Sequence, residues 1–298
     1  MIANYHTHTA RCGHARGEDR EYVERAVERG LETLGFSEHV PLPFADGHES
    51  YFRVPLARLE DYVRSVLALR EEFRDRIRIL LGFEAEYYPD YFDRVRELTA
   101  PYPVDYFIMG QHFNDSTERP YNARPFADGS QLRGYVDRVL EGLATGHFLY
   151  LAHPDLPYYT GGDEDFYRRE MRRLCEGAKA LDIPLEINLL GIREDRNYPS
   201  PVFWEIASSA GCRTVLGCDA HSPDAVADPA ELETALAFAA RFGLRPELQI
   251  FGQGDGSFVR FSDKGTVPLS DRLSRRCSGG CAEGAVFSFL ERKMGARP

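Results

Sequence analysis

Histidine and carboxylate side chains recur in this sequence at spacings that suit divalent metal ions. His6 and His8 are two residues apart, and the same spacing separates Asp219 from His221. On an extended backbone, residues two apart point to the same side, so each pair could reach one ion. Neutral imidazoles together with carboxylates are the ligands that borderline divalent metals prefer. The other candidate ligands are His14, His39, Glu84, His112 and His153.

Short apolar runs alternate with longer helical patterns and would position these side chains. Seven runs predict strands, at Ile2–Tyr5, Thr33–Phe36, Ile77–Phe83, Tyr106–Met109, Phe148–Leu151, Leu185–Ile187 and Thr214–Leu216. The predicted helices are Glu18–Glu28, Pro55–Asp75, Gln131–Leu143, Asp165–Ala180, Pro201–Ser209 and Ala230–Phe242. This alternation predicts an α/β fold with a parallel sheet, either open or closed into a barrel.

Seven of the nine histidines lie at or just after the C-terminal end of a predicted strand, and only His48 and His147 do not. In parallel α/β folds that end of the sheet is where catalytic groups gather. A lone His-x-His pair is a weak signal, because single histidines are often structural. Their joint occurrence on six different strand ends predicts one shared metal site. Glu86 would point the same way as Glu84, so one of the two is expected to lie behind the ligands.

Composition excludes several classes of function. The chain has 298 residues, a formal net charge of −11 and a pI near 5.4, which argues against binding nucleic acid or anionic membranes through bulk charge. Its lysines are too few for Schiff-base chemistry or a carboxylated-lysine metal bridge; they are Lys179, Lys264 and Lys293. We expect no membrane partner and a cytoplasmic location, because no leader, long apolar run or CxxC pair is present. Whether the chain forms a homo-oligomer is left open.

The chain is expected to form one domain over residues 1–262. Residues 263–298 differ in being polar and rich in glycine and arginine, which predicts a short final helix or a partly disordered tail.

The candidate ligands together resemble the motifs of the polymerase and histidinol phosphatase (PHP) superfamily of metal-dependent phosphoesterases. Membership implies a distorted (β/α)₇ TIM-like barrel with two or three divalent ions, Zn, Mn or Fe, at the C-terminal ends of the strands. The matching motifs, in family order, are His6-x-His8, His14, Glu38-His39, Gly82-x-Glu84, His112, His153-Pro154 and Asp219-x-His221.

The resemblance also implies how the ligands are divided among the ions. The first ion would be held by His6, His8, Glu84 and Asp219, with Glu84 bridging to the second. His112 and His153 would complete the second site. The third ion would take His14, His39 and His221.

Within the superfamily, the chain most resembles the monofunctional histidinol-phosphate phosphatases. The resemblance lies in HTHTARCGHARGEDREYVERAVERGLETLGFSEHVPLP, in GFEAEY and in LEINLLGIREDRNYPSP. It implies hydrolysis of L-histidinol phosphate to L-histidinol and phosphate, a step of histidine biosynthesis. Two departures, Met109-Gly110-Gln111 before His112 and Cys218 before Asp219, remove no ligand but are expected to reshape the pocket.

The chemistry expected at such a site is in-line attack of a metal-bridging hydroxide on a phosphate monoester. Ions about 3.5–4 Å apart supply that hydroxide and neutralise the phosphoryl oxygens. Catalysis is assigned to Glu84, which bridges, and to Asp219 or His221, which would pass a proton to the leaving alkoxide. Arg193 and, second, Arg16 are the expected substrate-binding residues, because a guanidinium matches two phosphate oxygens.

Three other interpretations are weighed. A PHP-type phosphodiesterase or nuclease acting on nucleotides or oligonucleotides lacks support from any basic aromatic groove motif. A dinuclear amidohydrolase needs a lysine after a middle strand, and the sequence has none there. A metal-binding structural domain is the non-enzyme alternative, but a structural site needs only about four ligands.

Overall fold

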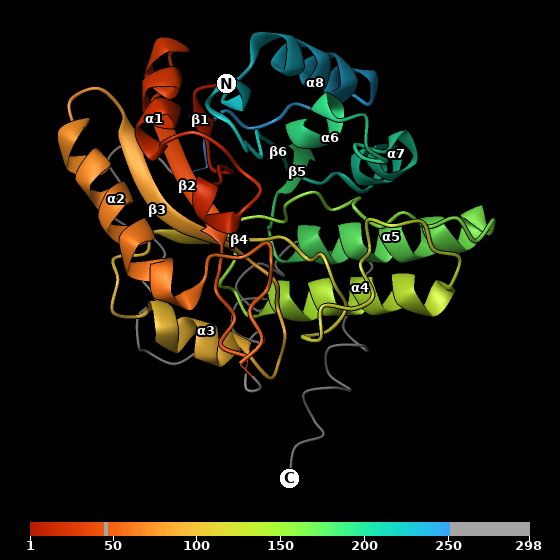
Figure 1. Cartoon of the computed structure of the whole chain (residues 1–298). Helices are drawn as coiled ribbons and strands as arrows, with labels where there is room; N and C mark the ends of the chain where they lie inside the picture. Colours follow the sequence, from red (N-terminus) through yellow and green to blue (C-terminus); the bar gives the residue numbers. More distant parts are fainter. Residues whose placement is uncertain (45–46, 251–298) are drawn as a thin grey trace, which may run out of the picture.

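A computed structural model describes residues 1–44 and 47–250 as a mixed α/β fold whose strands all run parallel (Figure 1). Four strands form one sheet in the order β1-β2-β3-β4, and β5 pairs with β6. Their bounds are β1 Ala3–Asn4, β2 Thr33–His39, β3 Arg78–Ala85, β4 Tyr106–Met109, β5 Leu185–Asn188 and β6 Thr214–Gly217. Each overlaps a predicted strand, but β2 and β3 extend beyond the predicted ends, so that His39 and Glu84 lie within strands. The predicted tail, residues 263–298, lies outside the described residues.

The predicted strand Phe148–Leu151 is wrong as an extended element. Only Leu151 forms β-bridges, and these are isolated parallel bridges to Met109 and Leu185. The segment stays short because the chain turns almost at once, with His153 at a φ of 31°. It still fills the place between β4 and β5. A further isolated bridge joins Thr7, after β1, to Ala220, after β6.

Helices cover the outside of the strands, and α4 and α5 lie side by side (Figure 1). The long helices are α1 Asp19–Glu28, α2 Leu59–Glu72, α4 Gly129–Ala144, α5 Glu164–Ala180, α7 Pro201–Ala210 and α8 Pro229–Arg241. Two shorter ones, α3 Phe92–Thr99 and α6 Leu189–Arg193, were not predicted, because eight and five residues give little periodicity. No helix within residues 1–44 and 47–250 is both long and apolar enough to cross a membrane.

The two faces of the strands pack into two different apolar clusters. On β3, Leu81 and Phe83 face the large core beneath the helices, whereas Leu80 joins a small inner cluster with Tyr106 and Val215. Because side chains alternate along a strand, Glu84 lies on the same inner side as Leu80. The inner face therefore has an apolar floor with polar groups towards the C-terminal strand ends.

Candidate metal centre

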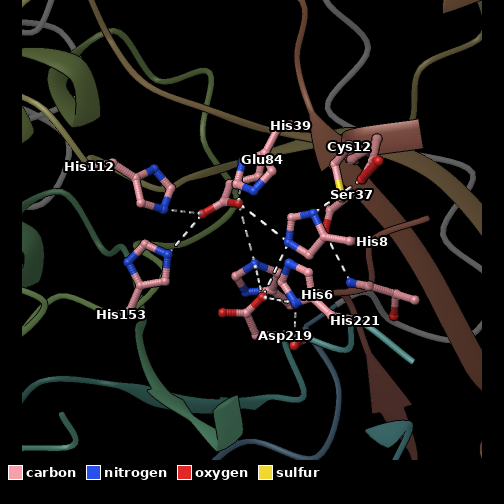
Figure 2. Close-up of polar contacts among 12 residues, drawn as sticks. His6, His8, Cys12, Ser37, His39, Glu84, His112, His153, Asp219 and His221 are labelled. Carbon is pink, nitrogen blue, oxygen red and sulfur yellow. Dashed lines mark hydrogen bonds and ion pairs between the residues drawn. The ribbon is translucent and has the colours of Figure 1, made fainter. Parts of the chain in front are cut away.

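Glu84 lies in the middle of the predicted ligands and presents one oxygen to each side (Figure 2). It is buried, at 1% exposed. Its Oε1 is 2.9 Å from His153 Nε2 and 3.8 Å from His112 Nε2. Its Oε2 faces three other imidazoles, at 3.0 Å from His39 Nδ1, 3.5 Å from His8 Nε2 and 3.6 Å from His6 Nε2. A carboxylate placed in this way can bridge two cations.

Gly110, at the end of the neighbouring strand β4, makes room for this carboxylate. A Cβ atom at residue 110 would lie 1.7 Å from Glu84 Oε1. No side chain larger than that of glycine fits there while Glu84 keeps its position. The unusual Met109-Gly110-Gln111 segment is therefore part of the site's construction.

Asp219 faces the same space from the segment after β6. Its Oδ1 lies 3.2 Å from His8 Nε2 and 3.4 Å from both His6 Nε2 and His221 Nδ1. Its Oδ2 accepts a hydrogen bond of 3.1 Å from Asn188 Nδ2. His6, His8, Glu84 and Asp219 thus direct their polar atoms towards one point.

His14 and His221 form the outer edge of the cluster. Their Nε2 atoms are 2.9 Å apart. Two ring nitrogens this close must share a proton or a cation, because two N–H groups would repel one another. His14 is exposed and His221 half-buried, whereas His39 beside them is buried. The structure thus brings all nine predicted ligands into one cluster.

Three buried glutamates lie behind the imidazoles, on the side away from the central space. Each one contacts the Nδ1 atom of a different histidine: Glu186 with His6 at 2.8 Å, Glu86 with His112 at 2.9 Å, and Glu38 with His8 at 3.1 Å. A carboxylate that accepts from Nδ1–H leaves Nε2 unprotonated, as metal ligation requires. The Glu186 contact was missed from the sequence, although a charged residue inside the apolar run Leu185–Ile187 was a usable signal. Glu38 was named from the sequence only as part of the Glu38-His39 motif.

Several polar atoms in the cluster are buried without a hydrogen-bond partner. They are His6 Nε2, His8 Nε2, His39 Nδ1, Glu84 Oε2 and His153 Nδ1. Buried polar atoms in native proteins nearly always have a partner, so this set is suited to binding a charged or polar ligand. The first four converge on the same space, and imidazole with carboxylate suits Zn, Mn and Fe. The residues present therefore fit divalent cations.

The electrostatics of the cluster favour cation binding as well. Burial raises the pKa of the Glu84 carboxyl, but the imidazoles of His39 and His6 outweigh it and hold that pKa well below its usual value. Burial and the neighbouring His8 lower the pKa of His221 to about 3. At neutral pH these groups are a carboxylate and a neutral ring, the forms that coordinate metals.

His6, His8 and His112 differ from His221, because nearby carboxylates outweigh burial and raise the pKa of each ring. Burial lowers the pKa of His8, but the carboxylates of Asp219, 3.2 Å from Nε2, and Glu38, 3.1 Å from Nδ1, raise it to about 9. An incoming cation must therefore displace a proton from His8.

The two predicted substrate-binding arginines lie at the edge of this region. Arg193 is held by Glu231, with Nε–Oε1 at 2.7 Å and Nη2–Oε2 at 2.9 Å, and Nη2 also donates to Cys218 O. Its Nη1 is the guanidinium nitrogen without a hydrogen-bond partner among the described residues. Arg16 donates its backbone N–H to His221 O at 2.9 Å, and its side chain is exposed.

Three further polar residues, His48, His147 and Asp155, contact residues outside the ligand cluster. His48 lies near Glu118, and His147 packs against Phe92, so neither joins the cluster. Asp155, which follows His153-Pro154, accepts hydrogen bonds from Trp204 Nε1 at 3.0 Å and from the backbone of Ser200 at 2.6 Å. It thereby holds the start of α7.

Comparisons with known proteins show what this chain is similar to. A family model described as the PHP domain matches residues 4–189. A protein of Deinococcus radiodurans named probable histidinol-phosphatase is 30% identical over 236 residues, covering 76% of this chain and 88% of that protein. The histidinol-phosphatase of Bacillus subtilis is 30% identical over 147 residues, which cover 46% of this chain and 54% of that protein.

Among solved structures, the histidinol phosphate phosphatase of Lactococcus lactis, in complex with zinc, L-histidinol and phosphate, has a similar fold. It superposes with a TM-score of 0.63 at 19% identity, over 82% of this chain and 95% of that chain.

Proposed function

Because the chain belongs to the PHP domain family, we propose that it is a metal-dependent phosphomonoesterase that converts L-histidinol phosphate and water to L-histidinol and phosphate. The observation that carries the proposal is Glu84, whose two oxygens face two separate sets of imidazoles. The substrate follows from the relatives, two of which are named as histidinol phosphatases.

The proposed ligands follow the division implied by the family. His6, His8, Glu84 and Asp219 would hold a first ion, and Glu84 would bridge to a second. His112 and His153 complete the second site, and a third would take His14, His39 and His221. A compact group of donor atoms occurs at His6, His8 and Asp219, which supports the first site. Other groups, at His6, Glu84 and His153, at His39, Glu84 and His112, and at His8, His39 and His221, each span two of the proposed sites. When bound, divalent ions lower the pKa of water and neutralise phosphoryl oxygens.

The chain's own residues would place the ions and the proton-transfer groups. Glu84 and Asp219 are carboxylates at neutral pH, since neighbouring imidazoles outweigh burial and hold both pKa values well below their usual range. His221, with a pKa of about 3, is neutral there and suited to ligation. Proton transfer from Asp219 or His221 to the leaving alkoxide stays a prediction, and it would require that group first to take up a proton from the attacking water.

We also propose that Arg193 and Arg16 contact the substrate phosphate. For Arg193 the contact would be made through Nη1, since Glu231 occupies the other edge of its guanidinium. An Arg193→Ala variant should then raise KM for L-histidinol phosphate more than it lowers kcat.

A distorted (β/α)₇ barrel is the architecture we propose for the strands. Its support is that Leu151 bridges β4 to β5 and that Thr7 bridges to Ala220, which would close the ring of seven segments. Cytoplasmic location stays a prediction, and homo-oligomerisation stays open.

The test is release of phosphate from L-histidinol phosphate by the full chain with added Mn²⁺ or Zn²⁺. We expect metal-dependent release that EDTA abolishes. Hydrolysis of 5′-nucleotides or dinucleotides, with none of L-histidinol phosphate, would instead identify a nucleotide phosphodiesterase. Metal binding without hydrolysis of any of these esters would support a structural role.

A further inference from the structure

Glu186, on β5, lies beneath the ligand cluster and is fully buried. Its Oε1 contacts His6 Nδ1 at 2.8 Å and accepts from Tyr150 Oη at 3.2 Å. Its Oε2 accepts from the backbone N–H of His153 at 3.0 Å and from Asn188 Nδ2 at 2.8 Å. Each oxygen has two partners, so this carboxylate is saturated.

Two of the residues that Glu186 holds have strained backbones. His153 has a φ of 31° and Asp219 a φ of 45°, in the left-handed region that non-glycine residues rarely adopt. Such strain persists only where the surroundings fix the conformation. Glu186 binds His153 N directly and reaches Asp219 through Asn188, whose Nδ2 donates to Asp219 Oδ2 at 3.1 Å.

The fold keeps a place for this carboxylate. A Cβ atom at Gly217, on the adjacent strand β6, would lie 1.7 Å from Glu186 Oε1. Glu186 therefore occupies space that any other residue at position 217 would take.

We propose that Glu186 is a positioning residue that fixes the tautomer of His6 and holds His153 and Asp219 in place for two neighbouring metal sites. The proposal rests on the ligands assigned under the proposed function. Of the three glutamates behind the imidazoles, Glu186 alone contacts residues assigned to both the first and the second ion. Glu38 contacts His8 and its neighbour Thr9, and Glu86 contacts His112.

A Glu186→Gln substitution separates this role from simple packing. Gln has nearly the same shape, but its amide NH₂ cannot accept a hydrogen bond. At the Oε2 position the NH₂ would face the backbone N–H of His153, which cannot reorient. At the Oε1 position it would face His6, whose ring can respond by moving its proton to Nε2. We therefore expect the glutamine NH₂ to occupy the Oε1 position. The His6 proton then lies on Nε2, the atom that faces Glu84 and Asp219, and prevents that atom from binding a metal ion.

The test measures tautomers and metal affinity in the full chain. Long-range ¹H–¹⁵N spectra of the EDTA-treated protein, assigned with His6→Gln and His8→Gln variants, are recorded at a pH high enough to leave both rings neutral, and they report which nitrogen of each ring carries the proton. For His6 we expect Nδ1–H in the wild type and Nε2–H in Glu186→Gln. Competition with a chromophoric chelator should show zinc affinity about 10–100-fold weaker in Glu186→Gln. In the matched Glu38→Gln variant the tautomer of His6 should be unchanged and that of His8 should switch.

The proposal is overturned if wild-type His6 carries its proton on Nε2, or if Glu186→Gln binds zinc within about twofold of the wild type. If Glu186→Gln does not fold, the position of the His6 proton in the wild-type spectrum alone tests the proposal. Neither measurement uses a phosphate ester. A chain that behaves as expected here but does not hydrolyse L-histidinol phosphate would refute the proposed function and leave the role of Glu186 standing.

Discussion

Substituting Gly110 with alanine adds one methyl group at the most confined point of the metal centre. The new Cβ would lie 1.7 Å from Glu84 Oε1 and 2.5 Å from its Cδ, whereas real Cβ contacts are essentially never shorter than 3.0 Å. Glu84 must therefore move by more than 1 Å. It cannot move freely, because it is 1% exposed and imidazoles surround both of its oxygens.

The size of the effect follows from that displacement. A misplacement of about 1 Å at a catalytic centre can cost roughly 100-fold in rate. That factor corresponds to about 2.7 kcal/mol of transition-state stabilisation. We therefore expect kcat/KM of Gly110→Ala on L-histidinol phosphate to fall at least about 100-fold. Metal content should fall too, since the displaced carboxylate is the proposed bridge.

The assay is phosphate release with added Mn²⁺, together with metal analysis of the purified variant. Gly177→Ala is the matched control. There the new Cβ would meet Leu140 Cδ2 at 2.2 Å between α4 and α5, so the variant should lose stability while kcat/KM stays close to wild type. A Gly110→Ala enzyme that is folded and within threefold of the wild-type kcat/KM would refute the assignment of Glu84 as a confined bridge.

Other predictions concern charge, pH and the start of α7. Glu84→Gln should bind metal more weakly and lose at least about 100-fold in kcat/KM, because the amide NH₂ cannot coordinate; full activity with full metal content would exclude bridging. In EDTA-treated protein, the raised pKa of His8 gives stability that is full below about pH 6.5 and is lost as the pH rises through 9. Denaturant titrations should therefore give a higher free energy of unfolding at pH 6.5 than at pH 9, and the reverse order would contradict that pKa. Asp155→Ala should lower that free energy by about 1–3 kcal/mol, because it leaves the Nε1–H of Trp204 without its acceptor. Trp204 is the sole tryptophan, so its fluorescence follows the transition directly, and an unchanged midpoint would contradict the role given to Asp155.

The clustering of the ligands was predictable because the C-terminal ends of parallel strands meet at one edge. His6, Glu84 and Asp219 are far apart in the chain, yet each follows or ends an apolar run that the sequence shows plainly. What was not predictable depends on contacts between distant segments. The pairing of Arg193 with Glu231 and the contact of Glu186 with His6 leave no periodic pattern.

The failed strand prediction has the same origin. Phe148–Leu151 has the composition of a strand, and local sequence could not reveal that the chain turns at His153 to place its imidazole beside Glu84. The left-handed backbone at His153 is set by its neighbours, Glu186 among them, rather than by its own residue type.

The cluster also has a gradient of solvent access, from buried His6 and His8 to exposed His14. Chelators and competing ions reach a coordination site by displacing its most accessible ligand first. Ions bound at the two ends of the cluster should therefore exchange at different rates, with the one beside His14 lost first on dilution or dialysis. The history of a preparation would then determine how many ions it carries, and two batches of one polypeptide could differ in activity while their sequences and folds are the same.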